Sequence, residues 1–145
     1  MRFSIKKVSA TEDFQKCLAI RKKVFVEGQQ VPLAEELDGK DDASDHYLLI
    51  VNDDIAVGVA RVRYLDRIAK VERVAILDEY QGQGLGKQLM EAILIELKQN
   101  KKINAIKLSS QCYAIPFYEK LGFSTCSEAY LDAGILHKDM VLKLN

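Results

Sequence analysis

Three glycines at alternating positions, Gly82, Gly84 and Gly86, separate an apolar segment from an amphipathic one. The apolar segment, residues 70–77, is typical of a β-strand, and the residues from Leu85 onward have helical spacing. Alternating glycines let the backbone approach a ligand closely and direct several N–H groups at one point. Because a helix N-terminus adds about half a positive charge, this strand–turn–helix unit predicts an anion site, most naturally for phosphate or pyrophosphate.

Two familiar phosphate-binding motifs do not fit this turn. A Walker A loop requires glycine at position 81 and serine or threonine at position 88, where the chain has Gln81 and Gln88. A dinucleotide-binding fingerprint read from Gly82 requires glycine or alanine at position 87, which is Lys87. A turn that serves only chain reversal is the simpler alternative, although three alternating glycines followed by a helix are more than a reversal needs.

The remaining patterns predict a mixed α/β domain. Apolar runs rich in β-formers predict strands at residues 3–8, 46–52, 55–65, 70–77, 103–109, 123–130 and 136–144. Helical spacing predicts helices after residue 9, from Leu85 onward and over 114–121, with Gly122 ending the last one. Residues 27–45 are acidic and irregular, and we expect a loop there with one helical turn.

The first predicted helix carries a charged residue on its apolar side. Ser9 and Glu12 form a capping-box pattern that predicts where this helix begins. Phe14 and Cys17 start an apolar stripe that also includes Arg21. An arginine on a buried face needs a partner, so Arg21 is a candidate for the functional site.

Composition narrows the class of protein. The 145 residues match the usual size of one domain, which we expect to span residues 1–145. Lys plus Arg and Asp plus Glu both number 21, and this balance argues against nucleic-acid binding. Three cysteines and two histidines lack metal-ligand spacing. Without a signal peptide or a run of ~18 apolar residues, the sequence predicts a cytoplasmic protein with no metal and no membrane partner.

Several segments resemble the GNAT superfamily of acetyl-CoA-dependent N-acetyltransferases. Residues 81–86 (QGQGLG) resemble its pyrophosphate loop, Q/R-x-x-G-x-G/A, and residues 74–76 resemble the L-x-V strand before it. Residues 111–123 (QCYAIPFYEKLGF) are similar to its second motif, and residues 21–46 resemble the ElaA-like subgroup. The resemblance covers nearly the whole chain and implies the GNAT fold, a central mixed, mostly antiparallel β-sheet flanked by helices.

The resemblance also implies acetyl-CoA as co-substrate and the residues that hold it. The strand before the glycine turn pairs through its backbone with the pantetheine arm in this family, and the turn binds the pyrophosphate. The position of Gln111 corresponds to an asparagine that touches the cofactor arm in many relatives. The implied cofactor-binding residues are Val74, Ala75, Ile76, Gln81, Gly82, Gln83, Gly84, Leu85, Gly86, Lys87, Gln111 and Phe117.

The implied reaction is direct attack of a primary amine on the thioester of acetyl-CoA. Tyr118 matches the family's acid, a phenol that protonates the coenzyme A sulfur, and an aromatic core residue is its alternative reading. Phenol and thiol pKa values are close enough for useful proton transfer.

The general base is open. Glu72 is the first candidate, because strand alternation places its side chain on the same face as Val74 and Ile76. An ion pair with Arg63 or Arg73 is the alternative role for Glu72. His46 and His137 are alternative bases, although a lone histidine is more often structural.

The candidates for the acceptor side of the site are Arg21, Phe25, Glu36, Asp38 and His46. Arg21 is expected either to pair with Asp38 or Glu36 or to bind a carboxylate of the substrate. A small-molecule amine and a protein amine both fit as acceptor, and a homodimer through the last strands fits family analogy. The alternative function is a non-catalytic acyl-CoA-binding sensor or scaffold.

Overall fold

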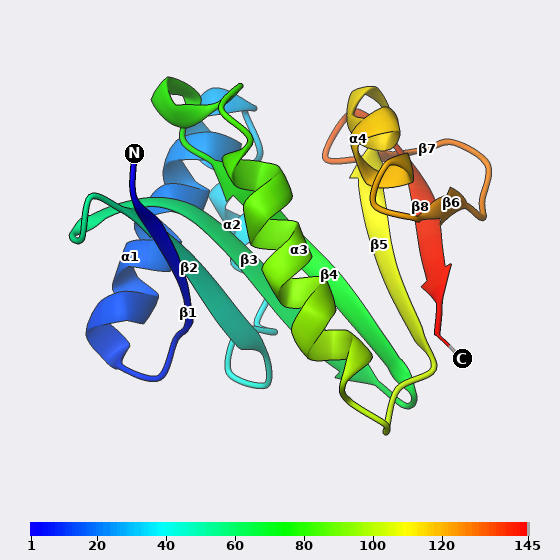
Figure 1. The fold of residues 1–145 in the computed structure, drawn as a ribbon. Helices are drawn as coiled ribbons and strands as arrows, with labels where there is room; N and C mark the ends of the chain where they lie inside the picture. The colour runs from blue at the N-terminus through cyan, green and yellow to red at the C-terminus, as the bar shows by residue number, and fades with distance from the viewer. Residues whose placement is uncertain (145) are drawn as a thin grey trace.

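Eight strands form one sheet in the computed structural model, which describes residues 1–144 (Figure 1). Their order is β1-β2-β3-β4-β5-β8-β6, with β7 paired to β8. Among residues 1–144, only β4 and β5 pair in parallel, so the predicted mixed, mostly antiparallel sheet is confirmed. The strands are β1 (Phe3–Lys7), β2 (Asp45–Val51), β3 (Ile55–Leu65), β4 (Ile68–Ile76), β5 (Ala105–Gln111), β6 (Ser124–Thr125), β7 (Tyr130–Asp132) and β8 (Ile135–Lys143).

Helices cover both faces of this sheet. The parallel pair β4–β5 needs a crossover connection, and α3 provides it. The helical segments are α1 (Thr11–Arg21), the π-helix η1 (Lys22–Gly28), α2 (Leu33–Glu36), the 3-10 turns η2 (Asp78–Tyr80) and η3 (Cys112–Ala114), α3 (Leu85–Lys98) and α4 (Ile115–Glu119). Within residues 1–144, no helix has both the length and the apolar character to cross a membrane.

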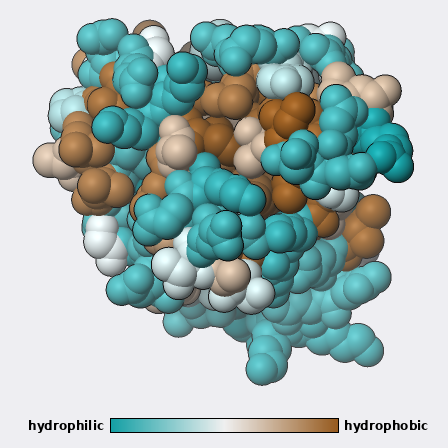
Figure 2. All heavy atoms as spheres, turned by 90° about the vertical axis from the view of Figure 1, so that its left-hand side faces the viewer, coloured by the Kyte–Doolittle hydropathy of each residue, from teal (hydrophilic) through white to brown (hydrophobic). Residues whose placement is uncertain are grey.

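Two apolar cores lie on opposite faces of the sheet. On one face, α3 buries Leu89 and Ile93 against β4 and β5, and α4 packs on the same core. On the other face, Cys17 and Ile20 of α1 pack against the sheet. The surface seen from the side of β1 and α1 is mainly hydrophilic, with hydrophobic residues gathered in the upper half of the view (Figure 2).

Three local predictions differ from the structure. The capping box at Ser9 is wrong, because Ala10 is the N-cap of α1 and makes no side-chain cap hydrogen bond. The first helix does not simply continue beyond Arg21 but widens into the π-helix η1. The strand predicted at 123–130 is interrupted and forms two short strands, β6 and β7, which both pair antiparallel with the long β8.

A β-bulge at Arg73 changes the orientation of β4. Arg73 has a φ of 55°, and the pairing with β3 shifts so that two residues of β4 oppose Ala60. Val71 and Val74 therefore pack against the same core, below α3. Glu72 lies on the other face, opposite Arg61. The prediction that Glu72 shares a face with Val74 is wrong, because the bulge reverses the alternation.

The parallel pairing of β4 and β5 covers only part of each strand. It joins residues 68–71 of β4 to residues 105–108 of β5. Beyond these residues the two strands separate, while β5 stays paired with β8 through Gln111. The sheet is therefore split at the carboxyl ends of β4 and β5, which is where the glycine turn follows β4 (Figure 1).

Candidate active site

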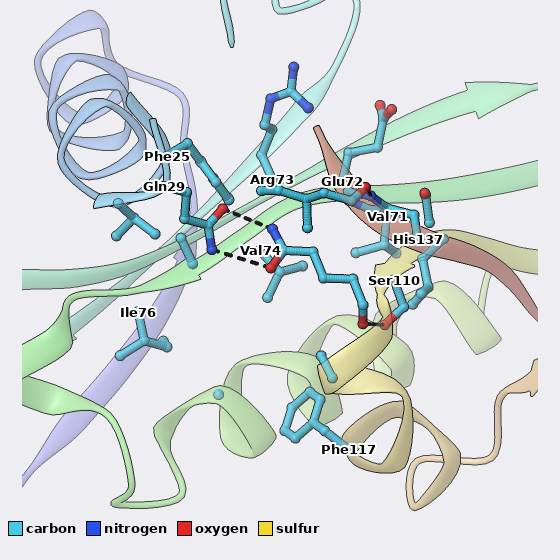
Figure 3. Close-up of a pocket in the computed structure, with 18 of the residues that line it drawn as sticks. Phe25, Gln29, Val71, Glu72, Arg73, Val74, Ile76, Ser110, Phe117 and His137 are labelled. Carbon is cyan, nitrogen blue, oxygen red and sulfur yellow. Dashed lines mark hydrogen bonds between the residues drawn. The ribbon is translucent and has the colours of Figure 1, made fainter. Parts of the chain in front are cut away.

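A cleft of about 1270 Å³ opens where β4 and β5 separate. Its walls come from η1, β4, the glycine turn, the end of β5, α4 and the β7–β8 hairpin. In Figure 3, Glu72 and Arg73 extend to one side of β4, and Phe117 lies on the opposite side. The cleft therefore passes through the sheet and is accessible to groups from both of its faces.

The glycine turn forms one end of this cleft. Gly82 and Gly84 have φ values of 77° and 80°, a conformation that other residues rarely adopt. Gly84 is the N-cap of α3, and no side chain caps that helix. Since the first amides of an α-helix have no internal acceptor, the N–H groups from Gly84 to Lys87 are available to an anion. The predicted anion site thus has its donors in place.

Gln81 has a different role from the one expected. Its backbone N–H donates to the Asp78 carbonyl at 3.2 Å, so it is not an amide donor for a ligand. Its side-chain amide donates to the Ile76 carbonyl at 2.9 Å and to Asp78 at 3.2 Å. Gln81 therefore fastens the turn to the end of β4. Gln83 is exposed and is not among the residues that line the cleft.

The free edge of β4 presents backbone groups to the cleft. The N–H of Leu77 donates to the carbonyl of Val57, on the β3 side, at 2.9 Å. Because successive residues of a strand direct their backbone groups to alternate sides, those of Val74 and Ile76 point away from β3. The pairing with β5 has already ended at this point, so an extended ligand can pair here.

Tyr118 lines the cleft from α4. Its ring makes edge-to-face contacts with Phe117 and Phe123, with centroid distances of 5.0 and 6.1 Å. Burial raises the pKa of the Tyr118 hydroxyl well above its ordinary value, with a smaller contribution from Tyr113. The phenol is protonated at neutral pH, as an unperturbed tyrosine also is, and carries a proton that it can donate.

Four arginines and four acidic residues form an ionic network at the α1 side of β3 and β4. Arg61 is fully buried and contacts Asp38 at 2.8 Å, Asp41 at 3.0 Å and Glu72 at 3.1 Å. Arg21, also fully buried, contacts Asp41 at 2.8 Å. The network holds loop 37–44 against the sheet. Its members are Arg21, Arg61, Arg63, Arg73, Glu36, Asp38, Asp41 and Glu72.

Two of the residues predicted on the acceptor side are not in the cleft. Arg21 donates to Glu36 at 2.5 Å and is enclosed, so it pairs with the acidic loop rather than facing a substrate. His46 is buried in β2, with Nε2 3.0 Å from the Asp41 carbonyl and its ring against Phe14. Of the two alternatives for Arg21, pairing with Glu36 is the one observed, and internal contacts likewise hold His46 away from the cleft. Phe25, Glu36 and Asp38 do line the cleft.

Glu72 lines the cleft but is held by arginines. Arg63 Nε donates to its carboxylate at 2.6 Å and Arg61 at 3.1 Å. Burial alone would raise the pKa of Glu72, but the Arg63 hydrogen bond and the charges of Arg61, Arg63 and Lys70 together lower it below its ordinary value. Such a carboxylate is a weak proton acceptor. Its role as general base stays a prediction that this geometry does not favour.

The end of β5 and the β7–β8 hairpin contribute residues that the sequence patterns did not single out together. Gln111 and Gln29 exchange two hydrogen bonds between their side-chain amides, at 2.8 and 3.3 Å (Figure 3). Tyr130 stacks on His137 with a centroid distance of 6.0 Å. Register places Gln111 and Tyr130 on either side of His137. This proximity depends on strand pairing, which spacing along the chain does not reveal.

Comparison with known proteins identifies the family. Residues 11–144 match the acetyltransferase (GNAT) domain family. The chain belongs to the GNAT family of acetyltransferases. A Bacillus subtilis (strain 168) member, BSU40680, is 38% identical over 136 residues, which are 92% of this chain and 92% of that protein. Protein ElaA of Escherichia coli (strain K12) is 30% identical over 128 residues, covering 85% of this chain and 82% of ElaA.

Solved structures agree with this family. The crystal structure of Escherichia coli ElaA matches 97% of this chain and 99% of its own with a TM-score of 0.86 and 25% identity, which supports the ElaA-like relation. A GNAT family acetyltransferase from Elizabethkingia anophelis, crystallised with acetyl-CoA bound, matches 98% of each chain with a TM-score of 0.72. At 17% identity, the second match indicates a shared GNAT fold alone.

Proposed function

We propose that this GNAT protein transfers an acetyl group from acetyl-CoA to a primary amine. One observation carries the proposal: the uncapped N-terminus of α3, the free edge of β4 and Tyr118 all belong to one cleft. An anion donor set, an extended pairing edge and a proton donor are the requirements of a long phosphorylated thioester. A site for a bare phosphate would need only the first of them.

The residues of the cleft fit acetyl-CoA part by part. Amide N–H groups from Gly84 to Lys87 would hold the pyrophosphate. The backbone of Val74 and the N–H of Ile76, whose carbonyl already accepts from Gln81, would pair with the pantetheine arm. The ring of Phe117 would cover the turn, since a Cβ on Gly86 would come within 3.6 Å of it. When bound, acetyl-CoA supplies an activated acetyl carbon as the electrophile.

Tyr118 is the proposed acid. Tyr118 lines the same cleft as the glycine turn, and its phenol is protonated at neutral pH with or without the raised pKa. A phenol held in this state can give a proton to the sulfur as it leaves. In the same cleft, an N–H of the β4 edge near Val74 would donate to the thioester oxygen, which gains negative charge during the reaction.

The acceptor would be a primary amine, either on a small molecule or on a protein. It would reach the cleft from the α1 side, past Phe25 and Gln29, because α3 and α4 occupy the other side. Membership of the GNAT family and the 38% identity to BSU40680 support an acetyltransferase.

The test is release of free coenzyme A thiol in the presence of an amine panel, with mass spectrometry of the acetylated product. The panel should contain polyamines, amino sugars, small amino compounds and peptides with free amino termini. Amine-dependent thiol release together with a product heavier by one acetyl group would support the proposal. Tight acetyl-CoA binding without turnover on any amine would instead favour a non-catalytic acyl-CoA sensor or scaffold.

A further inference from the structure

We propose that His137 is the general base of the reaction, accepting a proton from the acceptor amine at Nε2. This inference rests on the proposed function and adds to it a second catalytic residue. It starts from a histidine at the cleft wall whose two ring nitrogens have different surroundings. His137 lies at the start of β8, and 9% of its surface is exposed.

The tautomer of His137 is fixed by its backbone contact. Nδ1 lies 2.7 Å from the carbonyl oxygen of Ile135. Because a carbonyl oxygen only accepts hydrogen bonds, Nδ1 must carry the hydrogen, and the lone pair of the neutral ring is on Nε2. Residues 1–144 provide no hydrogen-bond partner for Nε2, and the residue lines the cleft.

Packing holds the ring in this position. Tyr130 stacks on it with an interplanar angle of 20°. The Tyr130 hydroxyl donates to Asp139 at 2.5 Å and also contacts the Ser109 hydroxyl, so the stacking partner is itself fixed. A base with a single orientation and a free lone pair is suited to receive a proton from a ligand bound in the cleft.

His137 and Tyr118 approach the cleft from opposite faces of the sheet. The side chain of Gln111, paired with His137 across the strands, bonds Gln29 of η1 on the α1 side. Tyr118 packs with the core under α3. An acceptor arriving from the α1 side therefore meets His137, and the leaving sulfur on the α3 side meets Tyr118. The geometry separates proton acceptor and proton donor as the chemistry requires.

Neither of the other candidate bases has these properties. The carboxylate of Glu72 is bonded to Arg61 and Arg63. His46 lies outside the cleft and has Nε2 against the Asp41 carbonyl, which gives it the opposite tautomer. Among these three residues, His137 alone combines a cleft position with a lone pair that no residue of 1–144 occupies.

Two protons move during the reaction. When the amine nitrogen bonds to the acetyl carbon and the carbon–sulfur bond breaks, Nε2 of His137 takes one hydrogen from that nitrogen. The Tyr118 hydroxyl donates its proton to the departing sulfur. The products are an amide and a free thiol, leaving an imidazolium and a phenolate. Water then returns a proton from the imidazolium to the phenolate and restores both side chains.

A spectroscopic experiment tests the assignment without any acceptor. The chain has two histidines, so ¹⁵N-labelled imidazole spectra of the wild type and His137→Gln assign both rings. We expect His137 in the Nδ1–H tautomer and His46 in the Nε2–H tautomer. An Nε2–H tautomer for His137 would overturn the inference and would leave the proposed function untouched. Absence of turnover on every amine, with the expected tautomer, would instead count against the proposed function.

A kinetic experiment tests the role with an amine that the panel shows to be acetylated. His137→Gln should lower kcat by roughly 100-fold or more and leave acetyl-CoA affinity unchanged. The acidic limb that a general base gives the wild-type pH profile of kcat should disappear in the variant. If kcat of the variant were lower by the same factor at every pH and the acidic limb persisted, His137 would only support the structure.

Other ionisable groups line the same cleft or contact Tyr130, and their titration needs to be separated from that of the ring. They are Tyr130 and Asp132 on β7, Asp139 on β8, and Lys70 and Glu72 on β4. None of them is removed by His137→Gln, so a limb that they cause would persist. Leu136→Ala, an exposed neighbour on β8 outside the cleft, is the matched control and should keep wild-type kcat and pH profile.

Discussion

Glu72 and Val74 lie on opposite faces of the sheet, although regular alternation along β4 would place them on the same one. The bulge at Arg73 between them causes the reversal. It directs the Glu72 carboxylate to Arg61 and Arg63 and the Val74 side chain to the core under α3. Beside the glycine turn, where the pairing with β5 has ended, the edge of β4 offers backbone groups to the cleft.

The ionic network makes Arg61 important for stability. Arg61→Leu should lower the free energy of unfolding by about 3–5 kcal/mol, because it leaves Asp38, Asp41 and Glu72 without their shared cation. Urea unfolding followed by circular dichroism measures this loss. Arg2→Leu is the control: Arg2 and Asp53 are 78% and 74% exposed, so this change should cost less than about 1 kcal/mol. Equal losses would contradict the role of the network.

The same network predicts destabilisation by acid. The Arg61 hydrogen bond holds the pKa of Asp38 well below its ordinary value, and the pKa values of Asp41 and Glu72 are also lowered. Since the unfolded chain binds protons more readily, this stability is complete above the unfolded pKa values and is lost as pH falls through the folded ones.

These lowered pKa values determine how the free energy of unfolding should change with pH. The free energy of unfolding should decrease below about pH 5 and keep decreasing below about pH 3, measured by urea unfolding at each pH. In Arg61→Leu the decrease should be shallower, because Asp38 loses the partner that lowers its pKa. A wild-type curve that stays flat down to about pH 3 would contradict the lowered pKa values.

The sequence was most informative where a rare backbone conformation required glycine. The φ values of Gly82 and Gly84 explain why the turn was recognisable, and the helix behind it follows from apolar spacing. The bulge left no such signal, because its left-handed residue is Arg73. Regular strand alternation therefore predicted the wrong face of the sheet for Glu72. The position of His137 depended on strand register, which a single sequence does not fix.

Gly84→Ala tests the glycine turn. Its Cβ would meet no atom within 4 Å, but alanine at a φ of 80° is strained, so stability should fall by about 1–2 kcal/mol. Calorimetric titration should also show weaker acetyl-CoA binding, because the first amides of α3 shift. Gly134→Ala has a similar φ of 77° and no close contacts, and should reduce stability alone. Equal acetyl-CoA affinity in both variants would exclude the turn from binding.

Tyr118→Phe tests the proposed acid. The substitution keeps the ring contacts with Phe117 and Phe123 and removes only the hydroxyl. We expect kcat to fall roughly 100-fold, with acetyl-CoA affinity nearly unchanged, in the thiol-release assay. Tyr64→Phe removes a hydroxyl on β3, outside the cleft, and should keep wild-type kcat. Full turnover in Tyr118→Phe would remove this hydroxyl from the mechanism.

The proposed acetyl transfer requires acetyl-CoA binding, and thermal unfolding tests this binding most directly. The melting temperature should be measured with and without saturating acetyl-CoA, with ATP and NAD as control ligands. At about 100 times its dissociation constant, a ligand specific for the folded state adds about 2.7 kcal/mol, which is a clear upward shift. The melting temperature should rise with acetyl-CoA and stay unchanged with ATP or NAD. A folded protein whose melting temperature does not change with acetyl-CoA would contradict the proposed acetyl transfer.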